Sequence, residues 1–343
     1  MNSDRYQRQA LLPQIGDGGQ RKLSQSRVLL VGCGALGSVI AEQLVRAGVG
    51  NLRISDRDIV ELTNLQRQVL FDEADVREAM PKAAAAVRRL AKINSDVRVE
   101  SEIVDVDGAN VEPLARGCDL ILDGTDNVET RYLLNDFAVK NAIPWIYGAC
   151  VGTEGRVMTI VPRKTACLRC VFPEPPIASE LPTCDTAGVL GPVASVVGSL
   201  QAIAAIKLLS GNSGAVAHEV LTLDLWSNRI RAIDLRDAKR ADCPTCGRRD
   251  FPFLQTSARD VVTRLCGRNA VQVRPTRIRE PLALESVETR LSRVGRVSRS
   301  EYLVRCELPD LLQLTVFRDG RMIVHGTADA ARARSLYARY LGA

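Results

Sequence analysis

The stretch that decides the fold is VLLVGCGALGSVIAEQL, residues 28–44. Four apolar residues, Val28–Val31, precede Gly32, Gly34 and Gly37, and a helix-like stretch follows. This order predicts a strand, a tight turn and the start of a helix. In such a turn the first glycine permits the bend, the second lets the backbone approach a phosphate, and the third lets helix and strand pack closely. Backbone N–H groups and the helix dipole then face an anion, so the stretch predicts a nucleotide site.

The first 150 residues alternate between apolar runs and helix-length segments. The predicted strands are Val28–Val31, Leu52–Ser55, Val97–Ile103, Asp119–Asp123 and Pro144–Ala149. The predicted helices between them are Ser38–Ala47, Lys82–Ile93 and Arg131–Asn141. This alternation predicts an α/β fold with a doubly wound, mostly parallel, Rossmann-like sheet. Ligands of such sheets bind beyond the carboxyl ends of the strands.

Length and composition limit the class of protein. A chain of 343 residues, 46% of them hydrophobic, has enough apolar surface for two domains. The first residues contain no charged segment followed by an apolar one, so no secretory signal is predicted. The longest uncharged run, residues 186–206, is interrupted by Gly188, Gly191, Pro192 and Gly198. We interpret it as a loop and a buried helix and not as a membrane span, and we expect a cytoplasmic protein.

Four of the ten cysteines form two short pairs, Cys167 with Cys170 and Cys243 with Cys246. Uneven spacing and the absence of a secretion signal argue against a disulfide framework. One pair alone is compatible with a redox dithiol, but two pairs together supply the tetrahedral set of thiolates that Zn²⁺ prefers. Four thiolates leave no open coordination position, so the sequence predicts a structural zinc site with four cysteine ligands.

The chain is predicted to contain two domains, residues 1–250 and 251–343. The second has sixteen Arg, no Lys and nine acidic residues. These arginines are dispersed and lack interleaved aromatic residues, so no nucleic acid is expected as a partner. An amphipathic helix around Leu284–Leu291, short strands, a turn at Asp319-Gly320 and a final helix predict a small α+β domain.

The glycine turn alone does not identify the nucleotide, because nicotinamide and flavin enzymes share it. Asp56 follows the next predicted strand, where a carboxylate accepts hydrogen bonds from ribose hydroxyls. An NAD-dependent dehydrogenase explains both features. It does not explain Asn64 and Arg67, Lys82 at the start of a helix, or Asp126 after a later strand. A triphosphate with its metal ion needs such cations and a carboxylate, which favours ATP with Mg²⁺.

In this order the motifs resemble the ThiF/MoeB/HesA family, the relatives of ubiquitin-activating enzymes. The resemblance runs from about residue 4 to 247 and leaves the C-terminal domain unmatched. The matching segments are RYQRQ (5–9), GCGALG (32–37), SDRD (55–58), NLQRQ (64–68), PK (81–82), GTDNVETR (124–131), CLRC (167–170), TC (183–184), GSLQA (198–202) and CPTC (243–246).

The resemblance implies an adenylyltransferase. Its substrates would be ATP and the C-terminal carboxylate of a ubiquitin-like β-grasp sulfur-carrier protein that ends in Gly-Gly. The products would be an acyl-adenylate and pyrophosphate, and the activated carrier would then accept sulfur in thiazole (thiamine) or molybdopterin synthesis. Adenylation gives the carboxylate a good leaving group, and the enzyme must neutralise and align two anions.

The resemblance also implies roles for individual residues. Arg8 would reach the phosphates of a partner subunit, because the family is typically dimeric, and Cys184 would form a covalent carrier intermediate in some members but not in others. The remaining roles are nucleotide contact by Gly32, Gly34, Gly37 and Asp56, phosphate contact by Asn64, Arg67 and Lys82, Mg²⁺ binding by Asp126, and support of that site by Asn127 and Arg131.

Three alternatives remain open from the sequence. An enzyme of the same family acting on a peptide or a tRNA would share these motifs. A dehydrogenase and a non-catalytic binding module belong to other classes. The sequence identifies neither the carrier protein nor a separate sulfur donor, nor the role of residues 251–343.

Overall fold

The computed structural model describes residues 3–176, 184–255, 262–265, 269–274 and 281–342. The chain folds into two compact units, Met1–Ser257 and Ala258–Ala343. The first unit extends beyond the predicted boundary at residue 250 because Phe251, Phe253 and Leu254 pack against its core.

The first unit is built on an eight-stranded sheet with the order β3-β2-β1-β4-β5-β6-β7-β8. The strands β1 to β5 are parallel, and β6 to β8 continue the sheet antiparallel to β5. This arrangement confirms the predicted doubly wound, mostly parallel sheet. The strands are β1 (Arg27–Val31), β2 (Asn51–Ser55), β3 (Arg98–Glu102), β4 (Leu120–Asp123), β5 (Trp145–Val151), β6 (Glu154–Ile160), β7 (Glu219–Asp224) and β8 (Arg229–Asp234).

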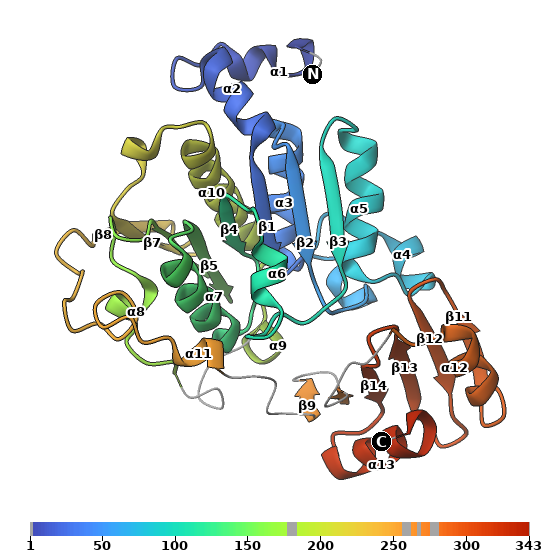
Figure 1. Cartoon of the computed structure of the whole chain (residues 1–343). Helices are drawn as coiled ribbons and strands as arrows, with labels where there is room; N and C mark the ends of the chain where they lie inside the picture. Colours follow the sequence, from blue (N-terminus) through green and yellow to red (C-terminus); the bar gives the residue numbers. More distant parts are fainter. Residues whose placement is uncertain (1–2, 177–183, 256–261, 266–268, 275–280, 343) are drawn as a thin grey trace. The chain divides into compact units, whose positions relative to one another are not determined.

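Helices cover both faces of this sheet (Figure 1). On one face α10 (Gly191–Leu209), α3 (Ala35–Ala47) and α5 (Lys82–Ile93) lie side by side, and on the other α7 (Val128–Asn141) packs beside α6 (Val111–Ala115). Among the described helices, α10 is long and apolar enough to cross a bilayer by length and composition alone. One side of α10 packs against α3, β5 and β6, so it is partly a core helix, as expected.

Shorter elements complete the first unit. They are α1 (Ser3–Ala10), α2 (Gly16–Gln25), η1 (Leu62–Asn64), α4 (Glu73–Arg77), α8 (Leu168–Val171), α9 (Cys184–Ala187), η3 (Ser213–Ala215) and α11 (Pro252–Gln255).

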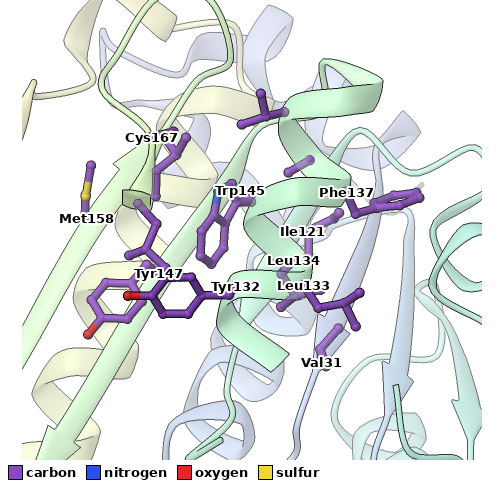
Figure 2. Packing of buried hydrophobic residues seen from close by; sticks show 14 of the residues in the cluster. Val31, Ile121, Tyr132, Leu133, Leu134, Phe137, Trp145, Tyr147, Met158 and Cys167 are labelled. Carbon is purple, nitrogen blue, oxygen red and sulfur yellow. The ribbon is translucent and has the colours of Figure 1, made fainter. Parts of the chain in front are cut away.

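The core beneath α7 is apolar and continuous with the cysteine loops. Figure 2 shows Tyr132, Leu133, Leu134 and Phe137 of α7 among the side chains of the sheet, including Trp145. The cluster extends to the four cysteines of the two pairs, three of them buried and Cys246 partly buried. The helix α7 is therefore fixed both to the sheet and to the cysteine loops.

The strand β8 forms one edge of the large sheet, and all six of its residues are exposed. Its charged residues Arg229, Arg231 and Asp234 are interspersed with Ile230 and Ile233. Both faces of this strand are therefore open to solvent over its whole length.

The second unit contains an antiparallel sheet with the order β11-β12-β13-β14-β10-β9. Helices α12 and α13 pack against one face and enclose an apolar core, which agrees with the predicted α+β class. The elements are β9 (Val262–Leu265), β10 (Ala270–Val273), α12 (Leu284–Leu291), β11 (Arg296–Arg299), β12 (Leu303–Glu307), β13 (Gln313–Phe317), β14 (Met322–His325) and α13 (Ala330–Leu341).

Candidate functional site

The glycine turn touches the end of a strand distant in sequence. Strand order reverses between β1 and β4, which is where doubly wound sheets bind ligands. Gly32 has φ +87°, and a Cβ at this residue would lie 2.8 Å from the carbonyl carbon of Gly124. A Cβ on Gly37 would overlap the carbonyl oxygen of Gly32. The turn and the loop after β4 therefore fit together only with glycine at these positions.

Asp56 follows β2 directly, and its side chain is hydrogen-bonded to the glycine turn. Its carboxylate accepts hydrogen bonds from the backbone N–H groups of Cys33, at 2.7 Å, and Asp58, at 2.8 Å. Burial raises the pKa of the Asp56 carboxyl above its ordinary value, and the Lys82 ammonium opposes that shift. Asp56 thus lies at the glycine turn, where a nucleotide ribose is expected.

Lys82 opens α5 and is only 3% exposed. Its ammonium lies 3.0 Å from a carboxylate oxygen of Asp58, and its backbone N–H donates to the Asp58 carbonyl at 2.8 Å. The sequence predicted phosphate contact for Lys82 but did not predict Asp58 as its ion-pair partner. This pair keeps a buried cation beside the glycine turn.

Asn64 and Arg67 belong to the loop that contains η1. Asn64 is buried, and its side chain accepts a hydrogen bond from the Glu61 backbone at 3.1 Å. The Arg67 guanidinium donates to the Thr63 carbonyl at 2.8 Å. Next to Arg67, the Gln68 amide nitrogen lies 3.7 Å from the position of a Cβ on Gly34. The loop therefore lies against the glycine turn.

Asp126, Asn127 and Arg131 occupy the loop after β4 and the first turn of α7. The Asp126 side chain is exposed, and Asn127 caps α7 by accepting a hydrogen bond from the Thr130 backbone at 3.1 Å. Arg131 pairs with the fully buried Asp123 at 3.1 Å. Its guanidinium also donates to a carbonyl of this loop, that of Thr125, at 2.7 Å. Arg131 therefore fixes the loop, while Asp126 presents its carboxylate to solvent.

Several supporting residues were not predicted as site residues. Gln201 of α10 donates from its side-chain nitrogen to the carbonyl of Asp123 at 2.7 Å, and burial raises the pKa of the Asp123 carboxyl against the opposing effect of Arg131. Gln68 is 4% exposed, and its side-chain oxygen has no hydrogen-bond partner among the described residues. Both glutamines occur in the quoted motifs, but only the fold shows that they reach this site.

Of the other two predicted site residues, Arg8 is not brought to this edge, and the side chain of Cys184 is not among the described residues. Arg8 is exposed on α1, whose Gln9 donates to the carbonyl of Ala47 at the far end of α3. The helix α1, which carries Arg8, therefore lies at the opposite end of α3 from the glycine turn of its own chain (Figure 1). Cys184 begins α9, which packs against β5, but its side chain lies outside the described residues.

The four cysteines of the two pairs come together as predicted. Their sulfur atoms all lie within 4.8 Å of one another. The separations are 3.8 Å for Cys167 to Cys170, 3.6 Å for Cys167 to Cys243 and 3.4 Å for Cys170 to Cys246. A tetrahedron with Zn–S bonds of about 2.3 Å has sulfur separations of about 3.8 Å. The cluster therefore has the size and donor set for zinc.

We expect one zinc ion per chain, and we expect Cys243→Ser to lose it. Since the ion would tie loops about seventy residues apart, its loss should cost several kcal/mol, or roughly 10 °C in Tm. Metal analysis and thermal unfolding test this, with Cys118→Ser as the control thiol outside the cluster. A Cys243→Ser variant that retains both zinc and Tm would contradict a zinc role for the cluster.

Comparison with protein families matches residues 6–245 to the ThiF family. The chain belongs to the ThiF family. The Bacillus subtilis sulfur carrier protein ThiS adenylyltransferase is 46% identical over 340 residues, covering 98% of this chain and 99% of the relative. The Thermus thermophilus sulfur carrier protein adenylyltransferase is 41% identical over 249 residues, covering 71% of this chain and 90% of the relative.

A solved structure of Escherichia coli MccB with ATP is similar in fold to this ThiF-family chain. It has a TM-score of 0.63 and 25% identity, and the match covers 72% of this chain and 75% of MccB.

The resemblance to the ThiF family that the motifs indicated is confirmed, and so is the expected enzyme class, an adenylyltransferase. The Bacillus relative also covers the second unit, which the motifs left unmatched.

Proposed function

We propose that this enzyme uses ATP to adenylylate the C-terminal Gly-Gly carboxylate of a ubiquitin-like sulfur-carrier protein of thiamine or molybdopterin synthesis. A carboxylate oxygen attacks the α-phosphorus, the bond from that phosphorus to the bridging oxygen breaks, and pyrophosphate leaves. The observation that carries the proposal is the contact between the glycine turn and the loop after β4 at Gly124. This contact lies at the point where the strand order reverses, and it brings the loop that carries the exposed Asp126 against the turn beside which Lys82 is buried.

The chain's own residues meet the demands of this reaction. Backbone N–H groups of the turn and the N-terminus of α3 receive the phosphates. Lys82 and Arg67 reduce the repulsion between the attacking carboxylate and the phosphates. Asp126, with support from Asn127, would hold Mg²⁺, which neutralises the charge on the leaving pyrophosphate when bound.

Carrier-dependent exchange of labelled pyrophosphate into ATP tests the proposal. ThiS-like and MoaD-like carriers should stimulate exchange, whereas the same carriers without their terminal Gly-Gly should not. Formation of AMP with a peptide or a tRNA, in the absence of exchange with any Gly-Gly carrier, would point to the alternative substrate class. Binding of NAD without ATP would contradict the proposal altogether.

The second unit is proposed to dock the carrier or another partner. The Thermus relative aligns with 71% of this chain and 90% of its own length, which supports catalysis by the first unit alone. A chain ending at residue 257 should therefore keep its KM for ATP and show a raised KM for the carrier in the exchange assay. An unchanged KM for the carrier would argue against docking by the second unit.

Self-association is proposed from an apolar surface around α10. Val196 and Ile203 of α10 are 37% and 49% exposed, and Leu11, which precedes the neighbouring helix α2, is 75% exposed. A second copy covering this surface would also explain why Arg8 lies far from the glycine turn of its own chain. We therefore propose a homodimer in which Arg8 contacts the phosphates of ATP bound to the partner subunit. The expected location of this dimer is the cytoplasm.

Mixing two inactive variants tests the shared site. Arg8→Ala and Asp126→Ala chains should each be inactive alone. After mixing and exchange of subunits, about a quarter of the sites combine an intact Arg8 with an intact Asp126. Exchange activity should recover to that fraction of the wild type. No recovery in a mixture shown to contain mixed dimers would contradict a role for Arg8 across the interface.

Whether sulfur arrives through Cys184 or directly from a separate donor is part of the same proposal. A covalent carrier adduct that is found by mass spectrometry and lost in Cys184→Ser would support the first route. An unmodified enzyme during full turnover would support the second.

A further inference from the structure

The helix α7 carries polar side chains on two successive turns, and the two turns bind different parts of the chain. Arg131, on the first turn, binds Asp123 at 3.1 Å and the carbonyls of Thr125 at 2.7 Å and Gly148 at 3.2 Å. Asp123 is the last residue of β4, Thr125 lies in the loop after it, and Gly148 is the middle residue of the neighbouring β5. Arg131 thus attaches the helix to the nucleotide edge of the sheet.

One turn later, α7 binds both cysteine loops. The Asn135 side chain accepts a hydrogen bond at 2.9 Å from the backbone N–H of Leu168, which lies between Cys167 and Cys170. The neighbouring Asp136 accepts one at 2.8 Å from the hydroxyl of Thr245, which lies in the second cysteine loop. The side chains of Asn135, Asp136 and Thr245 are fully buried, so these bonds do not compete with water.

Three further contacts hold the same helix to the chain around the cysteine loops. Asp136 also accepts a hydrogen bond from the backbone N–H of Phe253 at 3.1 Å. The hydroxyl of Tyr132 lies 3.0 Å from the carbonyl oxygen of Phe172 and 2.8 Å from that of Glu174. A shift of the cysteine loops would therefore move α7 as a whole.

We propose that Asn135 and Asp136 are positioning residues that couple the metal in the four-cysteine cluster to the nucleotide site through α7. The four-residue spacing from Arg131 to Asn135 is one helical turn, about 6 Å along the axis. A stiff helix transmits a displacement over that distance. With the metal bound, the first turn of α7 holds Asn127 and the loop of Asp126 in place.

Coupling of two binding sites is reciprocal. If the metal favours nucleotide binding, the nucleotide must favour retention of the metal by the same factor, typically about 5–150-fold. This inference rests on the proposed use of ATP, but it concerns a property that sulfur-carrier chemistry does not require. It can therefore be measured without a carrier protein.

The test follows zinc release from the full-length, zinc-loaded protein to a chromogenic chelator in excess Mg²⁺, with and without saturating ATP. ATP should slow release about 10-fold, within the usual range of coupling. Chelation of zinc by ATP itself would accelerate release, so it cannot imitate this result. Equilibrium dialysis of ATP with the same samples reports nucleotide binding independently.

Thr245→Val is the decisive variant, because it keeps the side-chain shape and removes only the hydroxyl that donates to Asp136. The zinc release rate without ATP, divided by the rate with ATP, should fall towards one in this variant. This holds even if the substitution changes the release rate measured without ATP. Asn135→Ala is the second variant and should act in the same direction. Asn141→Ala is the control, since Asn141 lies on α7 and its side chain donates to the Phe137 carbonyl of its own helix.

The outcomes separate the two proposals. ATP binding that leaves zinc release unchanged in the wild type overturns the coupling and leaves the proposed function standing. If ATP slows zinc release in both Thr245→Val and Asn135→Ala as much as in the wild type, the assignment of these residues is overturned. Such a result would mean that ATP stabilises the fold in general, because that effect would survive the substitutions. No binding of ATP would overturn both proposals.

Discussion

Asp126→Ala should reduce carrier-dependent pyrophosphate exchange by about 10²–10³-fold, the usual effect of removing one preorganised group that stabilises charge in the transition state. Asp126 is exposed on the loop that Arg131 fixes, so its carboxylate is available to a metal ion. Because the side chain is exposed, its removal should leave the Tm nearly unchanged. The loss should appear in kcat and should be partly recovered at high Mg²⁺ concentration.

Glu129→Ala is the matched control for this prediction. Glu129 is another exposed carboxylate, three residues later in the first turn of α7. Exchange measured across a range of Mg²⁺ should be the same for Glu129→Ala and the wild type. A similar loss of exchange activity in both variants would indicate a general electrostatic effect. It would contradict the assignment of Asp126 as a metal ligand.

The second large effect is expected in the glycine turn. A Cβ on Gly37 would overlap the carbonyl oxygen of Gly32, and neither backbone can yield without moving β1 or α3. Gly37→Ala should therefore cost about 3 kcal/mol or more, which is roughly 6–12 °C in Tm for a unit of this size. ATP binding should be lost together with stability.

Gly34→Ala separates binding from folding. The nearest atom to a Cβ on Gly34 is the Gln68 side-chain nitrogen at 3.7 Å, an ordinary van der Waals distance. This variant should keep a Tm near that of the wild type and lose affinity for ATP, because the methyl group occupies the space where phosphate approaches the backbone. Thermal unfolding and equilibrium dialysis of both variants check the pair. Equal losses of Tm would contradict the assignment of Gly34 to nucleotide contact.

The sequence predicted the parallel part of the large sheet well, because its central strands β1 and β4 are buried apolar runs. The predicted helix Lys82–Ile93 and strand Leu52–Ser55 agree closely with α5 and β2. The helices α1 and α2 were not predicted, because they are short and polar and are held by long-range contacts such as the hydrogen bond from Asn94 to Tyr6. No strand was predicted over β9, β10 or β11 either.

The candidate site was predicted less completely than the fold. Spacing identified Lys82 as a cation near the turn, but its pairing with Asp58 depends on how β2 and α5 meet in space. The same limitation applies to Gln201, which reaches the end of β4 from a helix 78 residues away. Motifs locate the groups that meet substrates, whereas the residues that hold those groups become visible only in three dimensions.

The open edge strand β8 has a consequence for the handling of this enzyme in concentrated solution. Its outer backbone groups offer a template for another strand, and intermolecular strand addition is a common route to insoluble polymer. Arg229, Arg231 and Asp234 are all exposed along β8, and desolvating those charges between two copies is unfavourable. At low ionic strength, repulsion between like guanidinium groups should help to keep the protein dispersed, and added salt should weaken that protection.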